Sequence, residues 1–229
     1  AEALHGFIES QGASISATSD RDYGGLYLST VSERLGDLLP VLGAMACRPT
    51  FPADELERER LQAREELEAL RDDSFQYAAL KLRARLYGDH PYGRPLLGTQ
   101  DSLKALTRED LVAHHRRHWV PENLLVVVSG DFDEDRLLAG LQEALADLPA
   151  GSPPPAAKLD PVRVPAGVES QVLERDMPQT VALCAWPGPV DAGADRVSLL
   201  MLKEVLNGQS GRLFEALRKS CLRRRGRDG

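Results

Sequence analysis

The sequence has few cysteines, few aromatic residues and no long apolar run. Its three cysteines are odd in number and far apart, which argues against a disulfide framework, and no C-x-x-C pair is present to bind zinc through thiolates. Aromatic residues make up 5% of the chain while hydrophobic residues make up 42%, so leucine, valine and alanine must supply most of the core. No apolar run approaches the length of a membrane span, and the N-terminus lacks the basic and apolar regions of a signal peptide.

A surplus of positive charge is also missing. The net charge of -7 argues against non-specific binding of nucleic acid, because neutralising phosphates requires basic residues in excess. The exception is the C-terminal tail, where one lysine and four arginines crowd together between Lys219 and Arg227. We therefore expect a soluble protein of the periplasm or the cytoplasm, with no membrane span and no nucleic-acid partner.

Helical and strand patterns alternate along the chain. Two strands are predicted at Ser14–Thr18 and Gly25–Val31, joined by a polar turn that is short enough for antiparallel pairing. A buried strand is predicted at Asn123–Ser129, and further strands at Val168–Leu173 and Thr180–Ala185. Helical patterns surround them, at residues 1–12, 32–47, 52–71, 74–87, 107–119, 135–148, 194–207 and 212–219. Gly12 is placed to end the first of these helices, and Thr107 with Asp110 is placed to cap the one at 107–119. The pattern predicts an α+β fold with helices packed on one face of a mostly antiparallel sheet.

A proline-rich stretch divides the chain. Residues 149–165 contain several prolines and no hydrophobic periodicity, which is typical of a linker. We expect a first domain at residues 1–148, a linker at 149–167 and the beginning of a second domain at 168–229.

The helix predicted after Pro52 carries two glutamates inside its apolar stripe. Steps of three and four residues place Glu59 and Glu66 on one face with leucine and alanine, at Leu56, Glu59, Ala63, Glu66 and Leu70. Neither glutamate has a cation three or four residues away, and neither does Glu65, whereas Asp54, Glu57 and Glu68 do. An inward carboxylate without a local cation requires another positive partner, and a metal ion is a leading candidate. The alternative is that the edge of the stripe is solvated and that both carboxylates point outward.

Five stretches, in order along the chain, resemble the M16 family of zinc peptidases, the group of pitrilysin, insulin-degrading enzyme and mitochondrial processing peptidase. They are IESQGASISATSDRDYGGLYLST, PTFPADELERERLQAREELEALRDD, GDHPYGRPLLGTQDSLKAL, HHRRHWVPENLLVVVSGDFD, and PQTVALCAWPGP with LNGQSGRLFEALR. Together they cover nearly the whole chain. The resemblance implies an M16 peptidase-like fold with two tandem domains.

The resemblance also implies zinc chemistry. In the family, an H-x-x-E-H helix supplies two histidine ligands and a general base, and a glutamate from a later helix supplies the third ligand. The stretch ERERLQAREEL aligns Glu66 with that ligand and Glu59 with a supporting acid, while Glu65 is the alternative in a shifted alignment. No H-x-x-E-H occurs in these residues, so we expect no zinc to be bound by this chain alone.

Two interpretations follow from the missing motif. The chain is either a fragment of a zinc-dependent endopeptidase that cleaves extended peptides, or a noncatalytic subunit that binds substrate or supports an active M16 partner. In the fragment interpretation both domains are incomplete: the first lacks its N-terminal strand and zinc-binding helix, and the other half of a clamshell chamber is missing. The upstream sequence would distinguish the two.

Two further features concern binding. The resemblance places the substrate, as an added strand, against the edge of Ser14–Thr18, at Ser16 and Ala17; Ser16 replaces an asparagine that is usual in the family. The alternative is an ordinary interior strand. His114 and His118 have the spacing of metal ligands on a helix, but no glutamate lies suitably between them and arginines intervene, so we interpret the segment as structural.

Overall fold

The computed structural model describes residues 2–155, 159, 162, 167–176, 179–186, 188, 195–207, 211–216 and 218. The chain forms two compact units, Ala1–Leu183 and Cys184–Gly229. This division does not test the domain limits expected from the sequence, which stay a prediction. None of the described helices is both long and apolar enough to cross a membrane.

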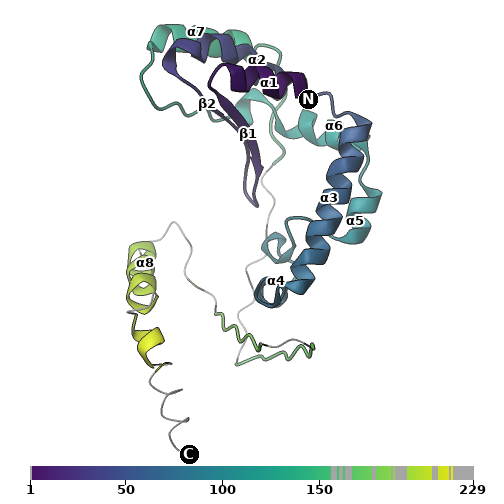
Figure 1. Cartoon of the computed structure of the whole chain (residues 1–229), viewed down its shortest axis with the longest axis vertical. Coiled ribbons are helices and arrows are strands. Elements are labelled where there is room, and N and C mark those ends of the chain that lie inside the picture. Colours follow the sequence, from purple (N-terminus) through teal and green to yellow (C-terminus); the bar gives the residue numbers. More distant parts are fainter. Residues whose placement is uncertain are drawn as a thin grey trace, which may run out of the picture. The chain divides into compact units, whose positions relative to one another are not determined.

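The first unit begins with a helix and a hairpin (Figure 1). Helix α1 spans Glu2–Ser10 and is followed by Gly12, whose φ of 66° suits a residue without a side chain. Strands β1 (Ser14–Ser19) and β2 (Gly24–Ser29) pair antiparallel, in the register Ser14↔Ser29 to Ser19↔Gly24. The two strands predicted here are thus confirmed.

A small core lies against one face of this hairpin. Ile8 of α1 and Leu38 of α2 (Leu35–Cys47) are buried, and Ile15 and Leu28, which are paired across the hairpin, pack against them. Since residues paired in register point to the same side of a sheet, both helices cover one face. The α+β class and its helices on one face are confirmed, although the described sheet has only two strands.

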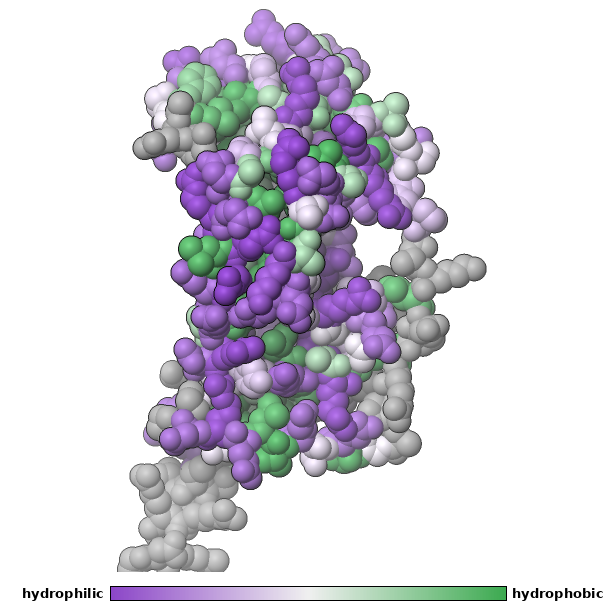
Figure 2. Space-filling model, turned by 90° about the vertical axis from the view of Figure 1, so that its right-hand side faces the viewer, coloured by the Kyte–Doolittle hydropathy of each residue, from purple (hydrophilic) through white to green (hydrophobic). Residues whose placement is uncertain are grey.

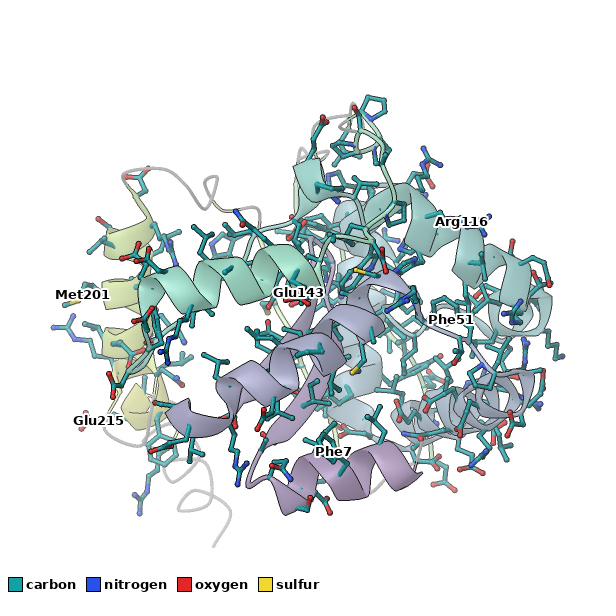
Figure 3. All side chains as sticks on the ribbon, turned by 90° about the horizontal axis from the view of Figure 1, so that it is seen from above. Phe7, Phe51, Arg116, Glu143, Met201 and Glu215 are labelled. Carbon is teal, nitrogen blue, oxygen red and sulfur yellow. The ribbon has the colours of Figure 1, made fainter. Side chains whose placement is uncertain are left out.

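Helix α7 (Glu134–Ala144) packs along α2, as Figure 1 and Figure 3 show. Gly43 permits this close approach, because a Cβ built there would meet the carbonyl of Ala144 and lie 2.9 Å from its Cβ. The Sγ atom of Cys47 lies 3.6 Å from the same carbonyl oxygen, and Arg48 pairs with Asp147 at 3.4 Å. The predicted helix is present but ends four residues before Leu148.

The next helices along the chain pack against one another, with α3 in contact with the other two. Helix α3 (Ala53–Asp72) packs against α4 (Ser74–Tyr87) and against the short helix α5 (Gln100–Ala105). Asp73 starts α4 by accepting hydrogen bonds from the amides of Phe75 and Gln76. Helix α5, which the sequence analysis did not predict, begins with a capping box between Thr99 and Ser102.

Hydrogen bonds connect the hairpin to the loop that follows α4. The hydroxyl of Tyr92 lies 2.8 Å and 2.9 Å from the carboxylate oxygens of Asp22, and Arg21 donates to the carbonyl of Arg94. Tyr92 also lies edge-on to Tyr87, with ring centroids 5.8 Å apart. The turn of the hairpin is therefore fixed to the loop between α4 and α5.

The strand predicted at Asn123–Ser129 is not present in this structure. A 3-10 turn, η3 (Pro121–Asn123), is followed by irregular backbone, and the side chains of Leu125 and Val127 are 85% and 80% exposed. No described strand lies beside this segment, so it has no neighbour with which to form a ladder. The segment is nevertheless strongly apolar.

The strands predicted at Val168–Leu173 and Thr180–Ala185 are irregular as well. The first segment contacts the α3–α4 region, where Arg85 pairs with Glu169 at 3.0 Å. Arg175 lies over the ring of Tyr77 and donates to the carbonyl of Arg71. These contacts fix the segment through side chains rather than through a strand ladder.

The second unit contains helix α8, Asp195–Leu206, which confirms the helix predicted at 194–207. Its side chains are exposed, including Leu200 and the Met201 labelled in Figure 3. Residues 212–216 and 218 are helical, which agrees with the start of the last predicted helix, and Lys219 lies outside the described residues.

Candidate functional site

Helix α3 carries the glutamates that the sequence singled out. Pro52 lies directly before the helix, and Asp54 and Glu55 occupy its first turn, where acidic side chains are favoured. Glu59, Glu65 and Glu66 are all exposed. Glu59 and Glu66 are seven residues apart and thus lie on the same side of the helix, about two turns from one another. Both carboxylates therefore point into solvent, which was the alternative to an inward orientation in the sequence analysis.

The side of α3 that is partly buried differs by one position from the predicted stripe. Leu56, Ala63 and Leu70 are half-buried as expected, but the positions between them are taken by Arg60 and Leu67 instead of Glu59 and Glu66. Stepping from Leu56 through Arg60, Ala63, Leu67 and Leu70 also keeps helical spacing. The sequence contains this second stripe, in which an arginine stands among apolar residues.

Arg60 explains how a cation can occupy that side. Its guanidinium group donates to the carbonyls of Leu103 and Leu106, the latter at 2.9 Å, and it pairs with Glu57 at 3.3 Å. The arginine thus joins α3 to the C-terminal end of α5. Nearby, the buried Nε of Arg64 has no hydrogen-bond partner among the described atoms.

The local charge pairs of α3 follow the prediction in part. Arg58 pairs with Asp54 at 2.9 Å, which lowers the pKa of that carboxyl group chiefly through the hydrogen bond. Glu68 makes no ion pair with the described arginines; it lies 3.5 Å from the amide nitrogen of Gln100. Glu66 accepts a hydrogen bond of 3.0 Å from Gln62, and no described cation pairs with it. An uncompensated pair of carboxylates thus faces outward at Glu59 and Glu66.

The edge of β1 lies open beside its partner strand. Within the described sheet β1 pairs only with β2, so its other edge presents backbone groups that have no strand opposite. Ser16 and Ala17, the predicted substrate-binding positions, are exposed and lie opposite Tyr27 and Leu26. Such an edge is able to pair with an added extended peptide.

Helix α6 (Arg108–His118) carries three histidines in different environments. It begins at Thr107, which forms the predicted capping box with Asp110. His115 is buried, lies 2.7 Å through Nε2 from the carbonyl oxygen of Ala46, and stacks on Trp119, so its role is structural as predicted. The rings of His114 and His118 stack on one another with centroids 4.3 Å apart. Partial burial, and then the proximity of His118, lowers the pKa of His114.

A cavity of about 360 Å³ opens beside this helix, and no sequence motif indicated it. Phe51 is part of its wall and has a φ of 43°, a conformation that a bulky residue rarely adopts. Arg108 donates to the carbonyls of Phe51 and Thr50, which holds the backbone there. Most of its lining is apolar: Leu26, Met45, Pro49, Phe51, Leu111, Trp119, with His114 and His115.

The donor set for a catalytic zinc is not assembled by the described residues. Nowhere among them do three His, Cys, Asp or Glu side chains cluster as they would around a metal ion. Glu66 is a single exposed carboxylate, and a catalytic zinc takes about three protein ligands and a water. The described residues therefore do not fit a zinc centre without further ligands.

The chain matches two peptidase family models over most of its length. Residues 1–100 match the model of insulinase, peptidase family M16, and residues 105–222 match that of the peptidase M16 inactive domain. An uncharacterized zinc protease of Mycobacterium leprae is 29% identical over 216 residues, which cover 93% of this chain and 48% of the relative. The chain thus spans about half the length of that curated relative.

Solved structures agree with these matches. A peptidase M16 inactive domain from Pseudomonas fluorescens superposes with a TM-score of 0.65 and 27% identity, covering 71% of this chain and 39% of that one. A protease from Helicobacter pylori shares the fold, with a TM-score of 0.61 and 21% identity over 68% of this chain and 38% of that one. The arrangement of α1, the hairpin and the following helices, together with both family models, shows that this chain belongs to peptidase family M16.

Proposed function

We propose that the chain is part of a zinc-dependent M16 endopeptidase that cleaves extended peptides, and that these 229 residues are inactive alone. The observation that carries the proposal is the outward pair of carboxylates on α3, Glu59 and Glu66, which have no described cation as partner. Acidic side chains that have no cation as partner on one side of a helix are suited to complete a metal site with ligands from another element.

In this proposal Glu66 is the carboxylate ligand of the zinc and Glu59 a supporting acid. The family's zinc, when bound, activates a water molecule for attack on the peptide bond. The described residues supply one ligand of the usual three, so in this proposal the others lie outside the described part of the chain, in flanking sequence or in another chain. The name of the mycobacterial relative, a zinc protease, supports the choice of metal.

The substrate in this proposal is a peptide in extended conformation. It adds to the free edge of β1 at Ser16 and Ala17, where backbone hydrogen bonds provide affinity without requiring a particular side chain. The tie between Tyr92 and Asp22 supports this role, because it holds the hairpin in place while a peptide pairs with it. The other half of the chamber, or a partner M16 subunit, would cover the bound peptide.

A noncatalytic subunit is the second candidate. It is favoured by the absence of H-x-x-E-H from the sequence and by the match of residues 105–222 to the model described as an inactive domain. In that case the chain would bind substrate or support an active partner, without holding zinc.

The experiment is a measurement of zinc content and peptide cleavage on the full-length protein, with any sequence that flanks these residues. Glu66→Gln should remove the bound zinc and the chelator-sensitive cleavage of an unstructured peptide, because a neutral amide is a poor substitute for a carboxylate. Glu65→Gln is the matched control: it lies about 100° around the helix and should retain both. Equal loss from the two variants would refute the assignment of Glu66. A full-length protein without zinc or cleavage would establish the noncatalytic subunit.

A further inference from the structure

The pair His114 and His118 differs from the other histidines whose side chains the structure describes. The Nε2 of His115 is taken up by the carbonyl of Ala46, and the Nδ1 of His90 accepts from the amide of Tyr92 at 3.2 Å. The ring nitrogens of His114 and His118 have no hydrogen-bond partner among the described residues. Two adjacent imidazole rings whose nitrogens make no hydrogen bond to the described residues are able to chelate a metal ion.

The backbone brings these two rings together. The residues are four apart on α6, so they lie on one side of the helix, and their centroids are 4.3 Å apart at an interplanar angle of 28°. His114 is exposed and His118 is partly exposed, so an ion from solvent has access to both. A small change of the side-chain torsions suffices to direct one nitrogen of each ring at a common point.

The neighbouring arginines do not prevent a cation from binding. Arg116 lies roughly 200° around the helix from His114, on the opposite side. Arg117 is the smallest of the four causes that lower the pKa of His114, and it is exposed, so water and salt weaken its charge. His118 is the last residue of α6, and the C-terminal end of a helix carries a partial negative charge that favours cations.

From this geometry we infer that His114 and His118 form a two-histidine site for a divalent transition metal, separate from the site proposed at Glu66. Imidazole ligands suit nickel, copper and zinc, with copper bound most tightly, and do not suit magnesium or calcium. Because the protein supplies two ligands, the remaining coordination positions stay open to water or to a ligand in the adjoining cavity, whose wall includes His114.

The test is a titration of the 229-residue chain, purified without a histidine tag, with nickel and copper salts alone. Cys184→Ser and Cys221→Ser are introduced first, because Cys184 is exposed and thiolates bind these metals. We expect one metal ion per chain by calorimetry, a copper electron-spin spectrum with two nitrogen ligands, and no binding of magnesium. His114→Gln and His118→Gln should each weaken the affinity at least about tenfold, as the loss of a direct ligand requires. Glu66→Gln should leave it unchanged.

A variant with the same number of histidines but different spacing is the sharpest control. The double substitution His118→Gln with Arg116→His keeps the number of histidines and places the pair two residues apart, on different sides of the helix. It should bind as weakly as His118→Gln alone. Binding that persists in the single variants or in the spacing variant would overturn the inference, as would a chain that binds no nickel or copper. Loss of metal on Glu66→Gln would instead assign the metal to the α3 carboxylates.

Discussion

Apolar residues of the same kinds occur before and after Val120, but representative side chains of the two segments differ in solvent exposure. Before it, Ile8, Leu38 and Leu39 are buried between helices and the hairpin. After it, Leu125, Val127 and Val172 are more than three-quarters exposed, although their stretches have strong strand propensity. On the face shown in Figure 2, apolar residues appear as scattered patches among hydrophilic ones. An apolar composition makes a segment suitable for burial, but the segment is buried only where another element is available to pack against it.

The difference has a simple cause. The hairpin joins two strands that are adjacent in sequence, so each supplies the other's hydrogen bonds. The helices satisfy their own backbone groups and carry their own caps, as at Thr107 and Asp73. An isolated segment such as residues 124–128 can do neither and depends on a neighbouring strand from elsewhere in the chain.

The difference in burial between the two segments is tested most directly by a substitution at Leu38. This side chain is fully buried, so Leu38→Ala should destabilise the first unit by about 2–5 kcal/mol through lost contacts and a cavity. Leu125→Ala removes the same atoms from an exposed site and should change stability by about 0.5 kcal/mol or less. Urea unfolding followed by circular dichroism measures both. Equal effects would mean that residues 124–128 are packed in solution.

A smaller effect is expected where α2 meets α7. Gly43→Ala would place a Cβ 2.7 Å from the carbonyl carbon of Ala144, so the helices must separate, at a cost of about 1–3 kcal/mol. Gly36→Ala lies in the same helix with open space around it and should stabilise by up to about 1 kcal/mol, because alanine is the better helix former. Thermal melting of the two variants decides; a neutral Gly43→Ala would show that α7 does not dock on α2.

The capping box of α6 should give the smallest effect, and one that depends on pH. Thr107→Ala should cost about 1 kcal/mol near neutral pH, since the amide of Asp110 loses its acceptor. Hydrogen bonds from Thr107, first from its side chain and then from its backbone, lower the pKa of Asp110 in the folded state. The carboxylate's contribution is therefore present above the unfolded pKa and is lost as the pH falls through the folded pKa.

The difference between the wild-type chain and Thr107→Ala should accordingly shrink in acid. The urea concentration at the midpoint of unfolding, measured for both chains from pH 7 down to about pH 3, follows this stability difference across the range in which aspartate titrates. A difference that stays constant over this range would show that Asp110 does not take part in the cap. The capping box of α5, formed by its N-cap Thr99 and by Ser102, contains no ionisable group, so acid should leave the effect of Thr99→Ala unchanged.

The sequence predicted the parts of the fold that depend on local signals. Gly12, Pro52 and Thr107 marked helix ends, and the short turn before Gly24 marked the hairpin. It predicted strands after Asn123 that this structure lacks, because an apolar sequence shows that a strand is favoured but not that a partner strand is adjacent. The helix α5 was missed although Thr99 and Ser102 form its cap.

The site was predicted less completely. Spacing put Glu59 and Glu66 on one side of α3, which is correct, but it did not show that Arg60 would take the contacting side. That choice depends on the carbonyls of Leu103 and Leu106, which lie more than forty residues away in the chain. The role of Glu66 as a ligand depends on residues that the spacing of one helix does not reveal, and it stays a prediction.

The docking of α7 on α2 has a consequence for synthesis on the ribosome. Cys47 and Ala144, which touch in the folded chain, are separated by 97 positions. At about 5–20 residues per second, roughly 5–20 s pass between the emergence of α2 and that of its partner, whereas the hairpin closes in microseconds. During that interval the side of α2 that contains Leu39 and Gly43 has nothing to pack against. A nascent chain should therefore be most susceptible to chaperone capture or misassociation while residues 48–144 are being made.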